Sequence, residues 1–151
     1  MPVGPILPAT DDPDSAGFWA ATREGKFVVQ KCGGCGELRF PPRPFCKYCQ
    51  SNDFSWHPVS GRGRIWSFAI AHKPVYPALA DFAPFPIVIV ELEEKPTLRI
   101  SGNVLAAPGA AINSVDPAKL RIGQPVHVTF QQVAEDVVLP QWLLTPPPGA
   151  A

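Results

Sequence analysis

The sequence predicts a mainly β protein with a short N-terminal helix, a small ribbon held by four cysteines, and a five-stranded barrel. Two features predict this arrangement: cysteine pairs confined to residues 32–49, and a succession of Val-, Ile-, Thr- and aromatic-rich segments after residue 60. A chain of 151 residues has room for about one domain with a small appendage. We divide it into an N-terminal tail and helix, a ribbon, a barrel and a C-terminal tail, at residues 1–25, 26–59, 60–145 and 146–151.

The N-terminal helix is predicted from the signals at its two ends. Asp12 followed by Pro13 is typical of an N-cap and a first helical position, and Gly25 is a stop signal. The segment between them has one apolar face, made by Phe18, Trp19 and Ala21.

The ribbon is predicted from the cysteine spacing. Residues 26–31 predict a strand that leads into a Cys-x2-Cys-x10-Cys-x2-Cys pattern. Each short pair can aim two sulfurs at one point, and neighbouring glycines permit the tight turn. Four thiolates suit either zinc or a rubredoxin-type iron, and because no ligand position is left open, the expected role is structural. The predicted ligands are Cys32, Cys35, Cys46 and Cys49.

The chain starts with neither the basic residues nor the apolar stretch of a signal peptide, and no uncharged apolar run is long enough to cross a membrane. We therefore expect a cytoplasmic protein. Its reducing surroundings favour metal ligation over disulfide formation for closely paired cysteines.

The barrel is predicted from five β-rich segments that are punctuated by proline or glycine, a pattern that favours a small closed barrel of OB type over a sandwich. A short helical turn is predicted at residues 116–120, with Asp116 as its cap. Alternation near the C-terminus places Val126, Val128 and Phe130 toward the interior. The five segments are residues 61–72, 85–94, 97–106, 125–134 and 137–145.

Two of these segments are apolar on both faces. Strict alternation places Trp66 and Phe68 on one face of residues 64–72 and Ile65 on the other, and residues 86–94 are also apolar on both faces. A small barrel with an apolar outer face requires a cover, which is the ribbon, the N-terminal helix or another protein.

The charges exclude an overall basic surface, because thirteen basic and thirteen acidic side chains leave no net charge. Six cations nevertheless lie near the ribbon, its exit and the loop after residue 71. Isolated cations on turns are usually solvated, but a local basic patch would suit the phosphates of a nucleotide-like group. These cations are Arg39, Arg43, Lys47, Arg62, Arg64 and Lys73.

Motifs of a self-contained enzyme, such as a nucleophile elbow, a phosphate loop or a paired-histidine zinc site, do not occur, and the three histidines are scattered. With all four cysteines committed to metal, no thiol is left as a nucleophile. His72 opens a loop over residues 72–85, which is either a proline-stiffened crossover or a functional loop. We expect no catalytic residues in this chain alone.

Four stretches resemble a known family: residues 18–51, 60–68, 88–94 and 120–130. Together they are similar to the acyl-CoA-associated family that joins a rubredoxin-like zinc ribbon to an OB-fold, domain of unknown function thirty-five. The resemblance covers about residues 14–145. Its most specific parts are Phe40–Arg43, Ser60–Gly63 and Ile122–Val126. Two residues depart from the family pattern: Lys47 stands where proline is common, and Lys95 where glycine often follows the acidic pair.

The resemblance implies an accessory subunit of a hetero-oligomeric acyl-CoA enzyme. The implied partner is a thiolase-like protein, an aldolase or thiolase such as those of steroid side-chain degradation, in a heterotetramer; an acyl-CoA hydratase is the alternative partner. The partner would supply the catalytic residues, while this chain binds structural Zn²⁺ and helps shape the acyl-CoA site. On this view the substrate-binding candidates are Arg43, His72, Lys73 and Tyr76. The candidates for partner contact are Trp19, Trp66, Phe68, Ile87 and Ile89.

Two rival functions come from other classes of protein. An OB-type barrel with exposed aromatics also suits a stand-alone module that binds single-stranded nucleic acid, against which the neutral charge counts. Iron in the four-thiolate site would instead make the chain a small electron carrier.

Overall fold

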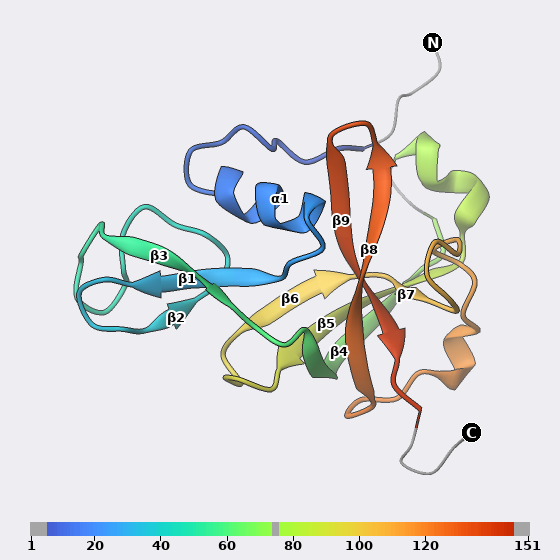
Figure 1. Cartoon of the computed structure of the whole chain (residues 1–151). Coiled ribbons are helices and arrows are strands. Elements are labelled where there is room, and N and C mark those ends of the chain that lie inside the picture. The colour runs from blue at the N-terminus through green and yellow to red at the C-terminus, as the bar shows by residue number, and fades with distance from the viewer. Residues whose placement is uncertain (1–5, 74–75, 147–151) are drawn as a thin grey trace.

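The computed structural model describes residues 6–73 and 76–146 (Figure 1). A three-stranded ribbon lies beside a six-stranded sheet that is curved into a barrel, and a single α-helix of the described residues lies against both. The elements are α1 (Ala16–Arg23), β1 (Val28–Cys32), β2 (Leu38–Arg39), β3 (Phe54–Pro58), β4 (Arg62–Ala71), the 3-10 helix η1 (Pro77–Phe82), β5 (Phe85–Leu92), β6 (Arg99–Gly102), β7 (Val104–Leu105), the 3-10 helix η2 (Pro117–Lys119), β8 (Pro125–Ala134) and β9 (Val137–Leu144).

Helix α1 starts later than its sequence signals predict. Its N-cap is Ser15, whereas Asp12 caps the preceding turn, accepting the Asp14 N–H on its side chain and the Ser15 N–H on its carbonyl. The Asp12–Pro13 prediction was therefore wrong by one turn, because an Asx turn uses the same side chain as an N-cap. The predicted stop is confirmed, since Gly25 has a φ of 71° that suits the left-handed residue after a helix. Neither α1 nor any other helix in the described part of the chain is long and apolar enough to span a membrane.

The larger sheet closes because two consecutive short strands, β6 and β7, pair with its opposite edges. Its order is β6-β5-β4-β8-β9-β7, and β6 and β7 are separated along the chain by Asn103 alone. The Asn103 side chain donates to the Pro86 carbonyl of β5 at 2.9 Å, and its own carbonyl accepts from the Trp142 N–H of β9 at 2.9 Å. β6 pairs antiparallel with β5, and β7 pairs parallel with β9. The strand predicted at residues 97–106 is thus interrupted where it crosses the seam, and the OB-type barrel is confirmed.

A β-bulge changes the faces of β4. Its pairing with β5 shifts register between Ile65 and Ser67. As a result Ile65 is buried in the core, Phe68 also packs against the core, and Trp66 is 44% exposed. The prediction that Trp66 and Phe68 share a face was wrong, because the extra residue of a bulge breaks strict alternation.

Helix, ribbon and barrel share one hydrophobic core. Phe27 precedes β1, yet its ring lies 5.9 Å from that of Trp142 in β9 and 6.0 Å from that of Phe18 in α1, measured between centroids. Val126 is buried in the same core, and Phe130 packs against it, as alternation predicts. The ribbon is therefore anchored to the barrel by the residues that lead into it. Asp116 caps η2 by accepting from the Ala118 N–H at 3.0 Å, which confirms the predicted turn.

Candidate functional site

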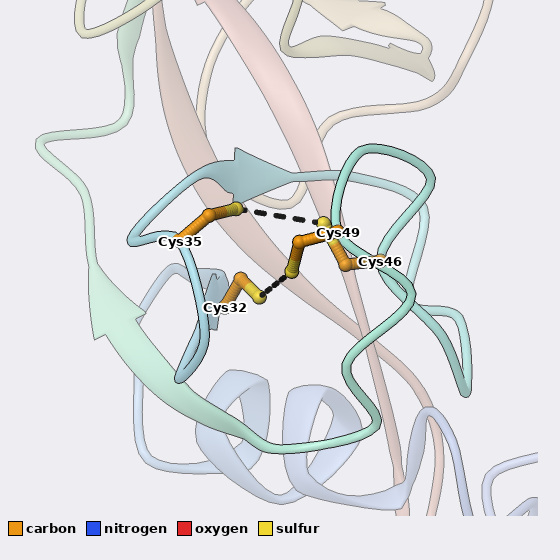
Figure 2. A group of neighbouring side chains, drawn as sticks. All are labelled: Cys32, Cys35, Cys46 and Cys49. Atoms are coloured by element: carbon orange, nitrogen blue, oxygen red, sulfur yellow. Dashed lines mark hydrogen bonds between the residues drawn. The ribbon is translucent and has the colours of Figure 1, made fainter.

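The four cysteine sulfurs converge at the end of the ribbon (Figure 2). Cys32 ends β1 and Cys35 lies in the following turn, while Cys46 and Cys49 lie between β2 and β3. The Sγ atoms are 3.5 Å apart for Cys32 and Cys49 and 3.7 Å apart for Cys35 and Cys46, and all four lie within 4.8 Å of one another. A tetrahedral Zn²⁺ with Zn–S bonds of about 2.3 Å places sulfurs about 3.8 Å apart. The arrangement therefore fits one metal ion held by four thiolates.

The two cysteine pairs have the same local backbone. The Gly36 N–H donates to the Cys32 carbonyl at 3.0 Å, and the Gln50 N–H donates to the Cys46 carbonyl at 2.9 Å. Both donors have left-handed φ, 76° for Gly36 and 63° for Gln50. Each turn thus folds back on its first cysteine, which directs both sulfurs of the pair to the same side.

Backbone N–H groups favour the thiolate at two of the sulfurs. The N–H groups of Cys35 and Gly34 lower the pKa of Cys32 to about 6, and the N–H of Cys49 lowers the pKa of Cys46. Burial, aided by the neighbouring sulfurs, raises the pKa of Cys35 to about 12. The thiolate is thus favoured at Cys32 and Cys46, and the thiol at Cys35. A bound cation would favour the thiolate at every position.

Three of the five predicted partner-contact residues are on the outer face of the barrel. Ile87 and Ile89 pair with Ala69 and Ser67 across β4 and β5, on the side away from the core, and Ile87 is 40% exposed. Trp66 is the third, and it is 44% exposed. The guanidinium of Arg99, in the neighbouring part of the same sheet, stacks on the Trp66 ring at 3.8 Å from its centre.

The other two predicted contact residues lie elsewhere. Phe68 packs against the core, and Trp19 lines an open cavity of about 640 Å³ between α1, the ribbon and the barrel. That cavity is mostly apolar, with Phe40, Pro41 and Pro140 also in its wall.

The four predicted substrate-binding residues do not form one cluster. Arg43 lies in the ribbon, whereas His72 and Lys73 directly follow β4 and Tyr76 directly precedes η1. The 3-10 helix η1, drawn in light green, lies on the opposite side of the barrel from the ribbon (Figure 1). Tyr76 is 56% exposed and lines a shallow apolar hollow with Ile87, so it adjoins the outer face of the barrel.

The predicted basic patch separates into groups. Arg39, Arg43 and Lys47 line one small cavity, while Arg62 and Arg64 line another together with Glu91 and Glu93. Gln30, which the sequence patterns did not single out, is a fully buried residue of β1 whose side chain contacts both Arg39 and Arg43. Its only sequence signal is a polar residue inside the otherwise apolar start of a strand.

Comparison with known proteins agrees with this architecture. Residues 19–55 match the family model described as the rubredoxin-like zinc ribbon domain of ChsH2, and residues 56–131 match that of the ChsH2 C-terminal OB-fold domain. Among solved structures, the chain superimposes on the Ltp2-ChsH2(DUF35) aldolase with a TM-score of 0.76 and 28% identity, covering 91% of this chain and 98% of the other.

Two curated relatives extend the comparison. A 3-oxo-4,17-pregnadiene-20-carboxyl-CoA hydratase alpha subunit from Mycobacterium tuberculosis is 33% identical over 131 residues, which are 87% of this chain and 36% of the subunit. This chain therefore spans about a third of that relative's length. A DUF35 domain-containing scaffold protein from Methanocaldococcus jannaschii is 31% identical over 110 residues, 70% of this chain and 68% of the relative. The chain belongs to the ChsH2 (DUF35) family, in which a rubredoxin-like zinc ribbon is joined to an OB-fold domain.

Proposed function

We propose that the chain is the accessory subunit of a hetero-oligomeric acyl-CoA enzyme, and that its partner is a thiolase-like aldolase or thiolase. The partner supplies the catalytic residues, and this chain supports the acyl-CoA site. The similarity to the aldolase structure carries this proposal, because it extends over 98% of the ChsH2(DUF35) chain. A hydratase partner is the second candidate, favoured by the relative whose name is a hydratase subunit.

The outer face of the barrel is the proposed contact surface for the partner. We name it the β4–β5 face and define it by Trp66, Ala69, Tyr76, Ile87 and Ile89. Trp66, Tyr76 and Ile87 are 44%, 56% and 40% exposed. Contiguous exposed aromatic and aliphatic side chains are typical of surfaces that become buried in a complex.

The proposed metal is structural Zn²⁺, bound by Cys32, Cys35, Cys46 and Cys49. The sulfur spacing supports one tetrahedral ion with no open ligand position, which suits a structural role and not a catalytic one. The metal content and the colour of the purified protein distinguish zinc from iron, since a four-thiolate iron site absorbs visible light and zinc does not.

Co-expression with a thiolase-like protein tests the proposed function. We expect a stable hetero-oligomer in size-exclusion chromatography with light scattering, and acyl-CoA turnover only by the complex. Ile87→Asp should abolish assembly, because it places a charge in the centre of the β4–β5 face. Ile122→Asp is the matched control, since Ile122 is 70% exposed and lies outside this face.

Assembly that withstands Ile87→Asp as well as Ile122→Asp would refute the proposed surface. Acyl-CoA turnover by the isolated chain, or failure to associate with either a thiolase-like protein or a hydratase, would refute the accessory role.

A further inference from the structure

A small basic cavity of about 190 Å³ lies between the ribbon and the barrel. Three cations line it, Arg39, Arg43 and Lys47, and no described Asp or Glu does. On the barrel side its wall is Thr97 and Leu98, which directly precede β6. In a chain with equal numbers of basic and acidic residues, this is a local excess of positive charge.

Arg39 is a buried cation without a counter-charge. The residue is 8% exposed, and its partners are neutral: Nε donates to Gln30 Oε1 at 2.7 Å, one terminal nitrogen donates to the Arg43 carbonyl at 3.2 Å, and the guanidinium carbon lies 5.6 Å from the centre of the Phe54 ring. Its other terminal nitrogen, Nη1, has no hydrogen-bond partner, and in residues 6–73 and 76–146 no carboxylate forms an ion pair with Arg39. Because a buried charge without compensation is costly, an anion in the adjoining cavity would be stabilised.

The cavity wall is held in place before any ligand arrives. Gln30 Oε1 accepts both from Arg39 Nε and from the backbone N–H of Arg43, the latter at 2.9 Å. Since Gln30 is fully buried in β1, it ties both residues to a rigid strand. A preformed arrangement reduces the ordering cost of binding.

Exposed aromatic rings stand beside the cations. Phe45 and Tyr48 line the same cavity and are 55% and 59% exposed. The ammonium of Lys47 lies 4.9 Å from the centre of the Tyr48 ring. Glu37 is paired with Lys95, whose ammonium also lies 5.9 Å from the Tyr48 ring centre. An exposed ring in the wall of a cavity that Arg43 and Lys47 also line suits a planar base that carries phosphate.

We propose that this cavity binds the phosphorylated end of a nucleotide. The phosphate lies between Arg43 and Lys47, in the field of Arg39, and the base stacks on Tyr48. This assignment rests on the proposed function, under which the nucleotide is that of the acyl-CoA. The acyl-CoA would then be held at the ribbon by its nucleotide end, and its thioester would reach the partner.

Titration of the full chain with adenosine 3′,5′-bisphosphate tests the site directly. Arg43→Gln/Lys47→Gln removes two exposed cations that line the cavity. Its matched control, Lys31→Gln/Lys119→Gln, removes two exposed cations outside it. We expect salt-sensitive binding that the first pair of changes weakens roughly tenfold or more and the control leaves within about twofold. Inorganic phosphate should compete weakly, and Tyr48→Ala should reduce bisphosphate binding without changing phosphate binding.

Equal affinity in the two double variants, absence of bisphosphate binding, or binding of single-stranded oligonucleotides alone would overturn the proposal. The assembled complex separates this result from the proposed function. If the complex turns over acyl-CoA and the Arg43→Gln/Lys47→Gln change leaves the KM unaltered, the nucleotide site is wrong while the accessory role stands. If the change raises the KM and the control does not, the site is supported.

Discussion

At the residue scale, the cysteine site depends on backbone positions that tolerate little change. Gly34 has no room for a side chain, because a Cβ there would lie 2.9 Å from the Ser51 Cβ and 3.0 Å from the Cys49 Sγ. Gly36 has open space around it, and its counterpart in the second turn is Gln50. Space limits the first position, whereas only φ limits the second.

Gly34→Ala is therefore expected to weaken metal binding and to destabilise the ribbon by about 1–3 kcal/mol, as overpacking does. Gly36→Asn is the control, because asparagine tolerates a left-handed φ and meets no neighbour. Metal affinity from competition with a chromogenic chelator and thermal unfolding measure both effects. Similar losses in the two variants would contradict the packing argument.

The lowered pKa of Cys32 predicts how metal affinity depends on pH. Bound metal displaces protons, so affinity falls as the pH falls. Above pH about 6 the Cys32 thiol is already ionised in the free protein and contributes no proton, whereas below that pH it does. We expect the slope of log affinity against pH to steepen by about one proton below this point. Competition with a chelator between pH 5 and 8 measures this slope. A constant slope over that range would contradict the lowered pKa of Cys32.

At the element scale, the turn between β5 and β6 links the barrel to the ribbon. The Leu98 N–H donates to the Lys95 carbonyl at 2.9 Å, and the Lys95 side chain pairs with Glu37 of the ribbon. Lys95 does not have a positive φ, so the glycine common in the family at this position is not needed for the turn. The lysine instead adds a contact between the two parts.

Lys95→Gly is expected to lower the free energy of unfolding by about 1 kcal/mol, because it removes a half-buried ion pair and makes the unfolded chain more flexible. Lys95→Gln removes the charge alone and should cost less. Urea denaturation at low and high salt measures both, and a stabilising effect of the glycine would show that the ion pair contributes nothing.

At the scale of the whole molecule, the ribbon that carries the four cysteines and the barrel share one hydrophobic core. Phe27, Val28 and Val29 are buried in the same cluster as Trp142, and β1 then continues directly to Cys32. Release of the ribbon therefore uncovers part of the barrel core. The four cysteines are expected to affect the stability of parts of the chain that they do not touch.

Chelation of the metal, or Cys46→Ala, should lower the melting temperature of the whole chain by roughly 10 °C or more. Barrel and ribbon should unfold in one transition. Near-ultraviolet circular dichroism of the buried Trp142 measures this transition. Restoring the metal should reverse the effect of chelation but not that of Cys46→Ala. A barrel transition that is indifferent to metal would show that the two parts are independent.

Short-range patterns determined much of this protein: the cluster of four cysteines, most strands of the barrel, the stop at Gly25 and the cap at Asp116. These features depend on residues a few positions apart, where spacing and turn chemistry act directly. The tertiary structure alone decided that Trp66 faces outward on the same sheet as Ile87 and that Arg39, for which the sequence left a solvated position and a basic patch open, is buried against Gln30. A bulge depends on how two strands pair, and the burial of a cation depends on which distant elements cover it; neither interaction exists until the chain has folded.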